Sequence, residues 1–79
     1  MANVVIARTL DCRGLVCPLP VIKLSKAIKS IAKGAILEML TTDPGAVPDL
    51  QAFQKQTGHE VLDQSQAEGV FRFLVRRTK

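Results

Sequence analysis

The sequence contains no tryptophan or tyrosine, only three phenylalanines and a single histidine. Without a row of exposed aromatic side chains it lacks a platform for stacking bases, and we do not expect direct nucleic-acid binding. No apolar run approaches the ~18 residues that a membrane-spanning helix requires. Two cysteines and one histidine make a poor zinc ligand set. We therefore predict neither a metal nor another cofactor.

The two cysteines are also too few for the disulfide framework of a small secreted domain. Residues 1–9 lack the basic stretch and apolar core of a secretory signal peptide. These features predict a cytoplasmic protein with free thiols and no membrane association.

The chain has 79 residues, the size of one small domain, and we expect residues 1–79 to fold as one unit. A domain of this size buries only about 60% of the surface of its unfolded chain. A deep, closed active site is difficult to build on such a scaffold. We therefore expect a shallow site, with the substrate delivered by a partner protein.

β-Branched and apolar runs alternate with helical patterns along the chain. The expected strands are 4–10, 35–42, 59–64 and 70–76, and the expected helices are 18–33 and 46–57. A strand–helix–strand unit of this length implies that the first two strands are parallel. The order βαβαββ then predicts an α/β fold of the α+β two-layer sandwich type, with both helices on one face of a four-stranded mixed sheet.

Residues typical of helix ends support these boundaries. Gly34 and Gly58 follow the two expected helices and are candidate C-terminal caps. The first helix carries an apolar stripe at helical spacing, formed by Val21, Leu24, Ile28 and Ile31. In the last strand, Phe71, Phe73 and Val75 alternate with residues that face the other way.

Cys17 stands just before the first helix and is followed by Pro18 and Pro20. Free N–H groups and the positive end of the helix dipole at such a position favour a thiolate. If Cys17 is the N-cap, we expect its pKa to fall below about 8.5, with further positive potential from Arg13 and Lys23. The prolines lack an N–H group, and we hypothesise that they leave the thiolate incompletely hydrogen-bonded and therefore reactive.

Other interpretations of these side chains stay open. Cys17 could instead be a small buried hydrophobic residue. Cys12 lies five residues before it, a spacing unlike the C-x-x-C redox motif. Cys12 either forms an intramolecular disulfide with Cys17 or, as we favour, packs against the helix from a strand end. His59 is expected to be a solvated residue at the start of a strand.

The formal charge of +4 and the pI of about 9.5 suit nucleic acid, anionic substrates or acidic protein surfaces as partners. Basic residues are expected on the outer face of the first helix and near the C-terminus, namely Lys26, Lys29, Lys33, Arg72, Arg76 and Arg77. Docking of an acidic protein is a better explanation than nucleic-acid binding, and a simple contribution to solubility is the alternative. Arg13, Lys23 and Lys26 are the candidate docking residues.

Five residues around the thiol form the pattern D-x-x-G-x-x-C-P-x-P, namely Asp11, Gly14, Cys17, Pro18 and Pro20. With this motif the chain resembles the TusA/SirA/YedF-like family, small proteins that carry sulfur as a persulfide on the motif cysteine. The resemblance continues through residues 41–44 and 58–60 and covers nearly the whole chain. The family's fold is the βαβαββ sandwich predicted above.

The resemblance implies that Cys17 accepts sulfane sulfur from a cysteine desulfurase or a rhodanese-type protein and passes it to an acceptor protein. It implies a sulfurtransferase role in tRNA thiolation, molybdenum cofactor synthesis or sulfur oxidation. It also suggests that Asp43 lies near the motif, although a turn with Pro44 is the simpler role. Two other functions remain: a non-enzymatic regulatory or adaptor module, and a thiol–disulfide redox protein that uses Cys12 and Cys17.

Overall fold

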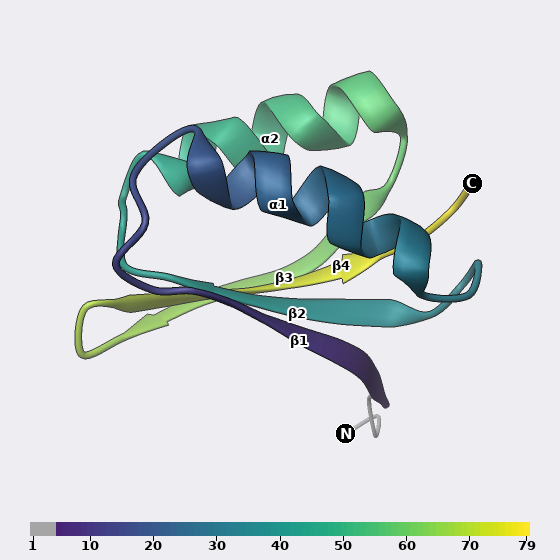
Figure 1. Cartoon of the computed structure of the whole chain (residues 1–79), viewed down its shortest axis with the longest axis horizontal. Coiled ribbons are helices and arrows are strands. Elements are labelled where there is room, and N and C mark those ends of the chain that lie inside the picture. The colour runs from purple at the N-terminus through teal and green to yellow at the C-terminus, as the bar shows by residue number, and fades with distance from the viewer. Residues whose placement is uncertain (1–4) are drawn as a thin grey trace.

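The computed structural model describes residues 5–79 as two helices packed on a four-stranded sheet (Figure 1). The elements are β1 (Ile6–Cys12), α1 (Leu19–Ala27), the 3-10 helix η1 (Ile28–Ser30), β2 (Ile36–Thr41), α2 (Ala46–Thr57), β3 (Glu60–Ala67) and β4 (Val70–Arg76). Both helices lie on the same face of the sheet (Figure 1). The predicted α+β sandwich is confirmed.

The strand order in the sheet is β1-β2-β4-β3. β1 and β2 are parallel, as predicted, and β4 pairs antiparallel with both β2 and β3. Cys12 at the end of β1 is in register with Thr41 at the end of β2. Because parallel strands end at the same edge of a sheet, the loops that lead into α1 and α2 lie together there (Figure 1).

The core lies between the helices and the sheet. The predicted apolar stripe supplies Leu24 from α1 and Ile28 from η1, and α2 supplies Leu50 and Phe53. The central strands contribute side chains that are fully buried, namely Leu37, Met39, Thr41, Phe73 and Val75. β2 alternates between buried and half-buried residues, so only one of its faces meets the core.

Several element boundaries differ from the prediction. β1 is shifted to Ile6–Cys12, and Val4 lies outside the described residues. β3 extends to Ala67 because the polar segment expected to be a loop pairs with β4. The hairpin turns at Glu68 and Gly69, both with positive φ, the geometry of a tight two-residue turn.

Helix α1 ends at Ala27 and continues only as one 3-10 turn, so the prediction that Gly34 caps it is wrong. The Arg77 guanidinium donates hydrogen bonds to the carbonyls of Lys29 and Ile31. These carbonyls would otherwise accept bonds from the next helical turn. The C-terminal segment therefore replaces the last part of the helix, and the N–H of Gly34 donates to the carbonyl of Arg77 instead.

Candidate functional site

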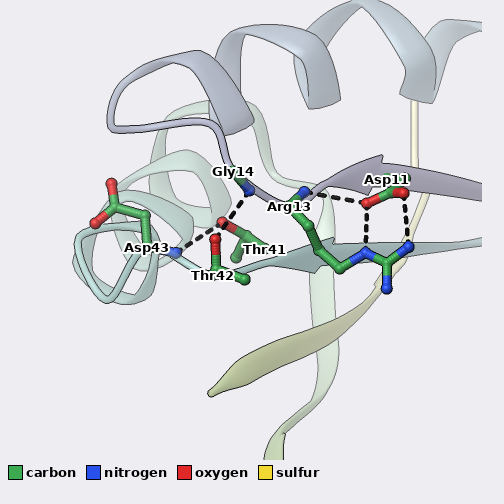
Figure 2. A network of polar contacts seen from close by, with 6 residues as sticks. All are labelled: Asp11, Arg13, Gly14, Thr41, Thr42 and Asp43. Carbon is green, nitrogen blue, oxygen red and sulfur yellow. Dashed lines mark hydrogen bonds and ion pairs between the residues drawn. The ribbon is translucent and has the colours of Figure 1, made fainter. Parts of the chain in front are cut away.

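The site lies where the β1–α1 and β2–α2 loops meet, and a short polar network joins the two loops (Figure 2). The N–H of Gly14 donates to Oγ1 of Thr42 at 2.9 Å. Gly14 has a φ of 82°, a left-handed conformation that favours glycine. The glycine of the motif therefore closes the first loop onto the second.

Asp11 and Arg13 form a second part of this network (Figure 2). The Asp11 carboxylate accepts hydrogen bonds from Nε and Nη2 of Arg13, each at 2.9 Å, and from the Arg13 N–H. These interactions lower the pKa of Asp11 to about 2. The charge of Arg13 is thus paired with Asp11, and the prediction that it adds positive potential at Cys17 is not supported by this geometry.

Asp43 connects the second loop to the cysteine. One carboxylate oxygen, Oδ2, accepts the N–H of Cys17, and the other accepts the N–H of Gly45 at 3.1 Å. Its own N–H donates to Oγ1 of Thr41 at 3.2 Å (Figure 2). Asp43 lies against the motif, as the resemblance implied, and it also forms the turn that leads into α2.

Gly45 is a site residue that has no role in the sequence prediction beyond the turn. A side chain at this position would place its Cβ 3.2 Å from the Cβ of Cys17 and 3.3 Å from Oδ2 of Asp43. Contacts this short are tighter than ordinary van der Waals packing. The two loops therefore approach each other closely because position 45 carries no side chain.

Cys17 is exposed, so the prediction of a reachable sulfur is confirmed and the alternative of a buried cysteine is wrong. It is not the N-cap, however, since Pro18 occupies that position after a cis Cys17–Pro18 bond. The N–H of Leu19 donates to the carbonyl of Val16 at 2.9 Å, and the N–H of Ile22 donates to the carbonyl of Pro18. These first-turn donors are occupied by backbone carbonyls.

The Cys17 thiol donates a hydrogen bond to Oδ2 of Asp49, with the sulfur and oxygen 2.6 Å apart. This bond raises the pKa of Cys17, and desolvation and the negative charges of Asp49 and Asp43 raise it further. The expected lowering of the pKa is therefore wrong, because two carboxylates face the thiol. The raised pKa favours the protonated thiol that donates this hydrogen bond.

Asp49 is the site residue that the sequence prediction missed. It lies in the first turn of α2, where its N–H donates to the carbonyl of Gly45 at 3.4 Å. The sequence explains an acidic residue there by the helix dipole alone. The available signal is topological: the start of α2 lies at the same sheet edge as the motif, so its first-turn side chains are near Cys17.

Exposed apolar residues lie close to Cys17 in the sequence. Val16 is 64% exposed, Leu19 44% and Ile22 45%. A groove of about 280 Å³ between α1 and α2 includes Ile22 and Asp49 in its lining. The sulfur is thus set in an open, partly apolar surface and not in a closed pocket, which agrees with the expected shallow site.

The basic residues divide into two groups. Lys23 and Lys26 line a second groove, of about 250 Å³, together with Arg8. The C-terminal arginines are engaged within the fold: Arg72 pairs with Glu38, Arg76 pairs with Glu60, and Arg77 binds backbone carbonyls. These arginines therefore bind groups within the fold and do not form the docking surface that the sequence suggested near the C-terminus.

Cys12 and His59 are both buried. Cys12 is fully buried in the core, as expected of a strand-end residue, and burial raises the pKa of its thiol. His59 is only 8% exposed and stacks on Phe53, with ring centroids 5.9 Å apart. Its Nδ1 accepts the N–H of Thr78 at 3.1 Å, and burial lowers its pKa. The prediction of a solvated histidine is wrong.

Within residues 5–79, no group of three or more histidine, cysteine, aspartate or glutamate side chains is arranged to hold a metal ion. None of the helices in the same part of the chain is both long and apolar enough to cross a membrane.

The sequence model of the sulfurtransferase TusA family matches residues 8–77. The chain belongs to this family. A sulfur carrier protein TusA of Allochromatium vinosum is 41% identical over 69 residues, which cover 87% of this chain and 91% of that protein. A putative sulfur carrier protein of Neisseria meningitidis is 46% identical over 70 residues, or 89% of this chain and 95% of that protein.

The fold has a counterpart among solved structures. The crystal structure of a SirA-like protein from Desulfitobacterium hafniense superposes with a TM-score of 0.77, covering 91% of this chain and 99% of that one. At 23% identity, this likeness concerns the fold alone. Membership of the TusA family, by contrast, supports a sulfur carrier function, in which such a chain interacts with sulfur donor and acceptor proteins.

Proposed function

We propose that the protein is a persulfide carrier that holds sulfane sulfur on Cys17. The observation that carries this proposal is the exposed Cys17 thiol, anchored between two loops in a chain of the TusA family. A cytoplasmic cysteine desulfurase or rhodanese-like protein donates the sulfur, and a protein thiol accepts it. The acceptor belongs to tRNA thiolation, molybdenum cofactor synthesis or sulfur oxidation, and the carrier itself contacts no nucleic acid.

The transfer is a thiol–persulfide exchange. The Cys17 sulfur attacks the outer sulfur of the donor persulfide, the new S–S bond forms, and the donor's own S–S bond breaks. The donor leaves as a thiol, and Cys17 becomes Cys17–S–SH. No external oxidant or reductant is consumed. One thiol that partner proteins can reach is sufficient for this chemistry, and a domain of 79 residues can supply it.

The other motif residues support the sulfur in this proposal. Asp43 fixes the backbone N–H of Cys17, and Gly14 ties the two loops together. The Asp11–Arg13 pair orders the turn at the end of β1. Pro18 is the N-cap of α1, and Pro20 is buried in its first turn. Together they hold Cys17 at the entrance of the helix with its side chain exposed.

The proposal is tested by treating the protein with a sulfane sulfur donor, such as glutathione persulfide, and weighing it intact. We expect a gain of one sulfur atom, which peptide mapping locates on Cys17 and a reducing agent removes. A protein that stays unmodified with small-molecule and protein donors alike would contradict the proposal. Formation of an internal Cys12–Cys17 disulfide would instead favour the redox alternative, which the full burial of Cys12 argues against.

Lys23 and Lys26 are the proposed docking residues for an acidic partner, since Arg13 is paired with Asp11. Rim charges act mainly on the association rate. Reversing both charges, in Lys23→Glu/Lys26→Glu, is therefore expected to slow loading from an acidic donor protein by roughly tenfold at low salt. Loading from glutathione persulfide should not change, and both rates are measured by mass spectrometry.

The matched control reverses two other exposed charges, Lys33→Glu/Lys55→Glu. This variant has the same net charge as the docking variant but leaves the groove beside β1 intact. An equal loss of loading in both variants would show a general charge effect and would contradict docking at Lys23 and Lys26.

A further inference from the structure

We propose that Asp49 acts directly on Cys17: its carboxylate accepts a hydrogen bond from the thiol in the free protein and takes the thiol proton when sulfur is loaded. Asp49 lies outside the motif around Cys17. The inference deepens the proposed function and rests on it for the loading step. The hydrogen bond itself can be tested without any sulfur donor.

The geometry holds Cys17 at two points. Asp43 accepts the backbone N–H, and Asp49 accepts the thiol at 2.6 Å. The Asp43 side chain is itself fixed by the N–H of Gly45, so the first point is rigid. With its backbone fixed, the cysteine side chain is directed toward the first turn of α2, where Asp49 stands.

The position of Asp49 suits a negatively charged acceptor. It lies in the first turn of α2, and the positive end of a helix dipole stabilises a negative charge there. Asp49 makes no ion pair with a basic side chain of residues 5–79, so its charge is not neutralised by an internal cation. The thiol of Cys17 is thus the partner that this carboxylate has in the fold.

The loading step balances with Asp49 as the proton acceptor. The S–H bond of Cys17 breaks, its proton moves to Oδ2 of Asp49, and the sulfur electron pair attacks the outer sulfur of the donor persulfide. The donor's S–S bond breaks, and its inner sulfur leaves as a thiolate with that electron pair. Cys17–S–SH, a protonated Asp49 and the donor thiolate are the products, and the proton then returns to the thiolate or to water.

The test is the pH dependence of Cys17 alkylation by iodoacetamide, which reports the thiolate fraction. In Asp49→Asn the midpoint should fall, and a fall of one pKa unit corresponds to a rate about tenfold higher at neutral pH. Asp49→Ser, which also removes the charge, should shift the midpoint in the same direction. Asp49→Glu should keep a midpoint above that of the asparagine variant.

Asp63→Asn is the matched control. Asp63 is exposed on β3, and its substitution removes the same negative charge without changing a group that contacts the thiol. Its alkylation profile should superpose on that of the unmodified protein. An unchanged or raised midpoint in both Asp49→Asn and Asp49→Ser would overturn the proposal. An equal fall in Asp63→Asn would also overturn it, since the effect would then reflect only net charge.

The loading profile completes the test. With glutathione persulfide as donor and at a pH below the alkylation midpoint, Asp49→Asn should load sulfur more slowly than its thiolate fraction predicts, because the carboxylate that takes the thiol proton is missing. A loading rate that follows the thiolate fraction in Asp49→Asn and in the unmodified protein alike would overturn the proton-acceptor role. If no variant loads sulfur while the alkylation shift is present, the persulfide function fails and the thiol–carboxylate contact stands.

Discussion

Cys17→Ser is expected to abolish sulfur loading completely, while Cys12→Ala should load sulfur as the unmodified protein does. A serine hydroxyl is not ionised at neutral pH and forms no stable bond to sulfane sulfur, so the variant lacks the accepting atom. Cys12 is fully buried, and a donor persulfide cannot reach it without unfolding. The measurement is the intact mass after incubation with glutathione persulfide, before and after reduction.

The serine variant preserves the site around the missing sulfur, because the Asp43 bond is made to the backbone N–H of residue 17. Its thermal unfolding should therefore match that of the unmodified protein, which separates loss of chemistry from loss of structure. Sulfur loading that persists in Cys17→Ser but disappears in Cys12→Ala would show that Cys12 carries the sulfur and would contradict the assignment to Cys17. An unchanged biological phenotype in Cys17→Ser would favour the adaptor alternative.

Phe73→Ala is expected to have the largest effect on stability. Phe73 lies on the central strand β4, is fully buried, and is in register with Met39 on one side and Gln64 on the other. Truncation of a buried phenylalanine costs roughly 3–5 kcal/mol, because apolar contacts are lost and a cavity remains. Total stability for such a domain is roughly 5–10 kcal/mol, so the variant should be largely or partly unfolded at 37 °C.

The free energy of unfolding by urea, followed by circular dichroism, checks this expectation. Leu62→Ala is the control, since Leu62 is 47% exposed on the edge strand β3. Its substitution should change the free energy of unfolding by no more than about 0.5 kcal/mol. A Phe73→Ala protein as stable as Leu62→Ala would contradict the assignment of Phe73 to the centre of the core.

The parts of the fold that depend on local signals could be predicted from the sequence. Helix α2 spans Ala46–Thr57 as expected, because a turn precedes it and Gly58, with a φ of 81°, ends it. β4 spans Val70–Arg76 as predicted, because Phe71, Phe73 and Val75 recur at the period of a strand. Leu74, which faces the other way, is buried as well. In both cases the residues that define the element are neighbours in sequence.

The boundaries that differ depend on partners far along the chain. The end of α1 is set by Arg77, which is 46 residues after Ile31. The length of β3 is set by backbone pairing with β4, which requires no apolar side chains in a strand at the sheet edge. Periodicity along one segment contains no information about such partners.

The sequence alone determined the order of the elements and the motif around Cys17, because helical and strand periods, turn residues and prolines act over a few positions. Only the tertiary structure decided that the sulfur is exposed and that its pKa is raised. The register of two parallel strands brings the start of α2 beside the start of α1, and with it the carboxylates of Asp43 and Asp49. The negative charges of these two carboxylates oppose the positive end of the helix dipole at the thiol. The direction of the Cys17 pKa shift therefore depends on the packed fold and not on the residues next to Cys17 in the sequence.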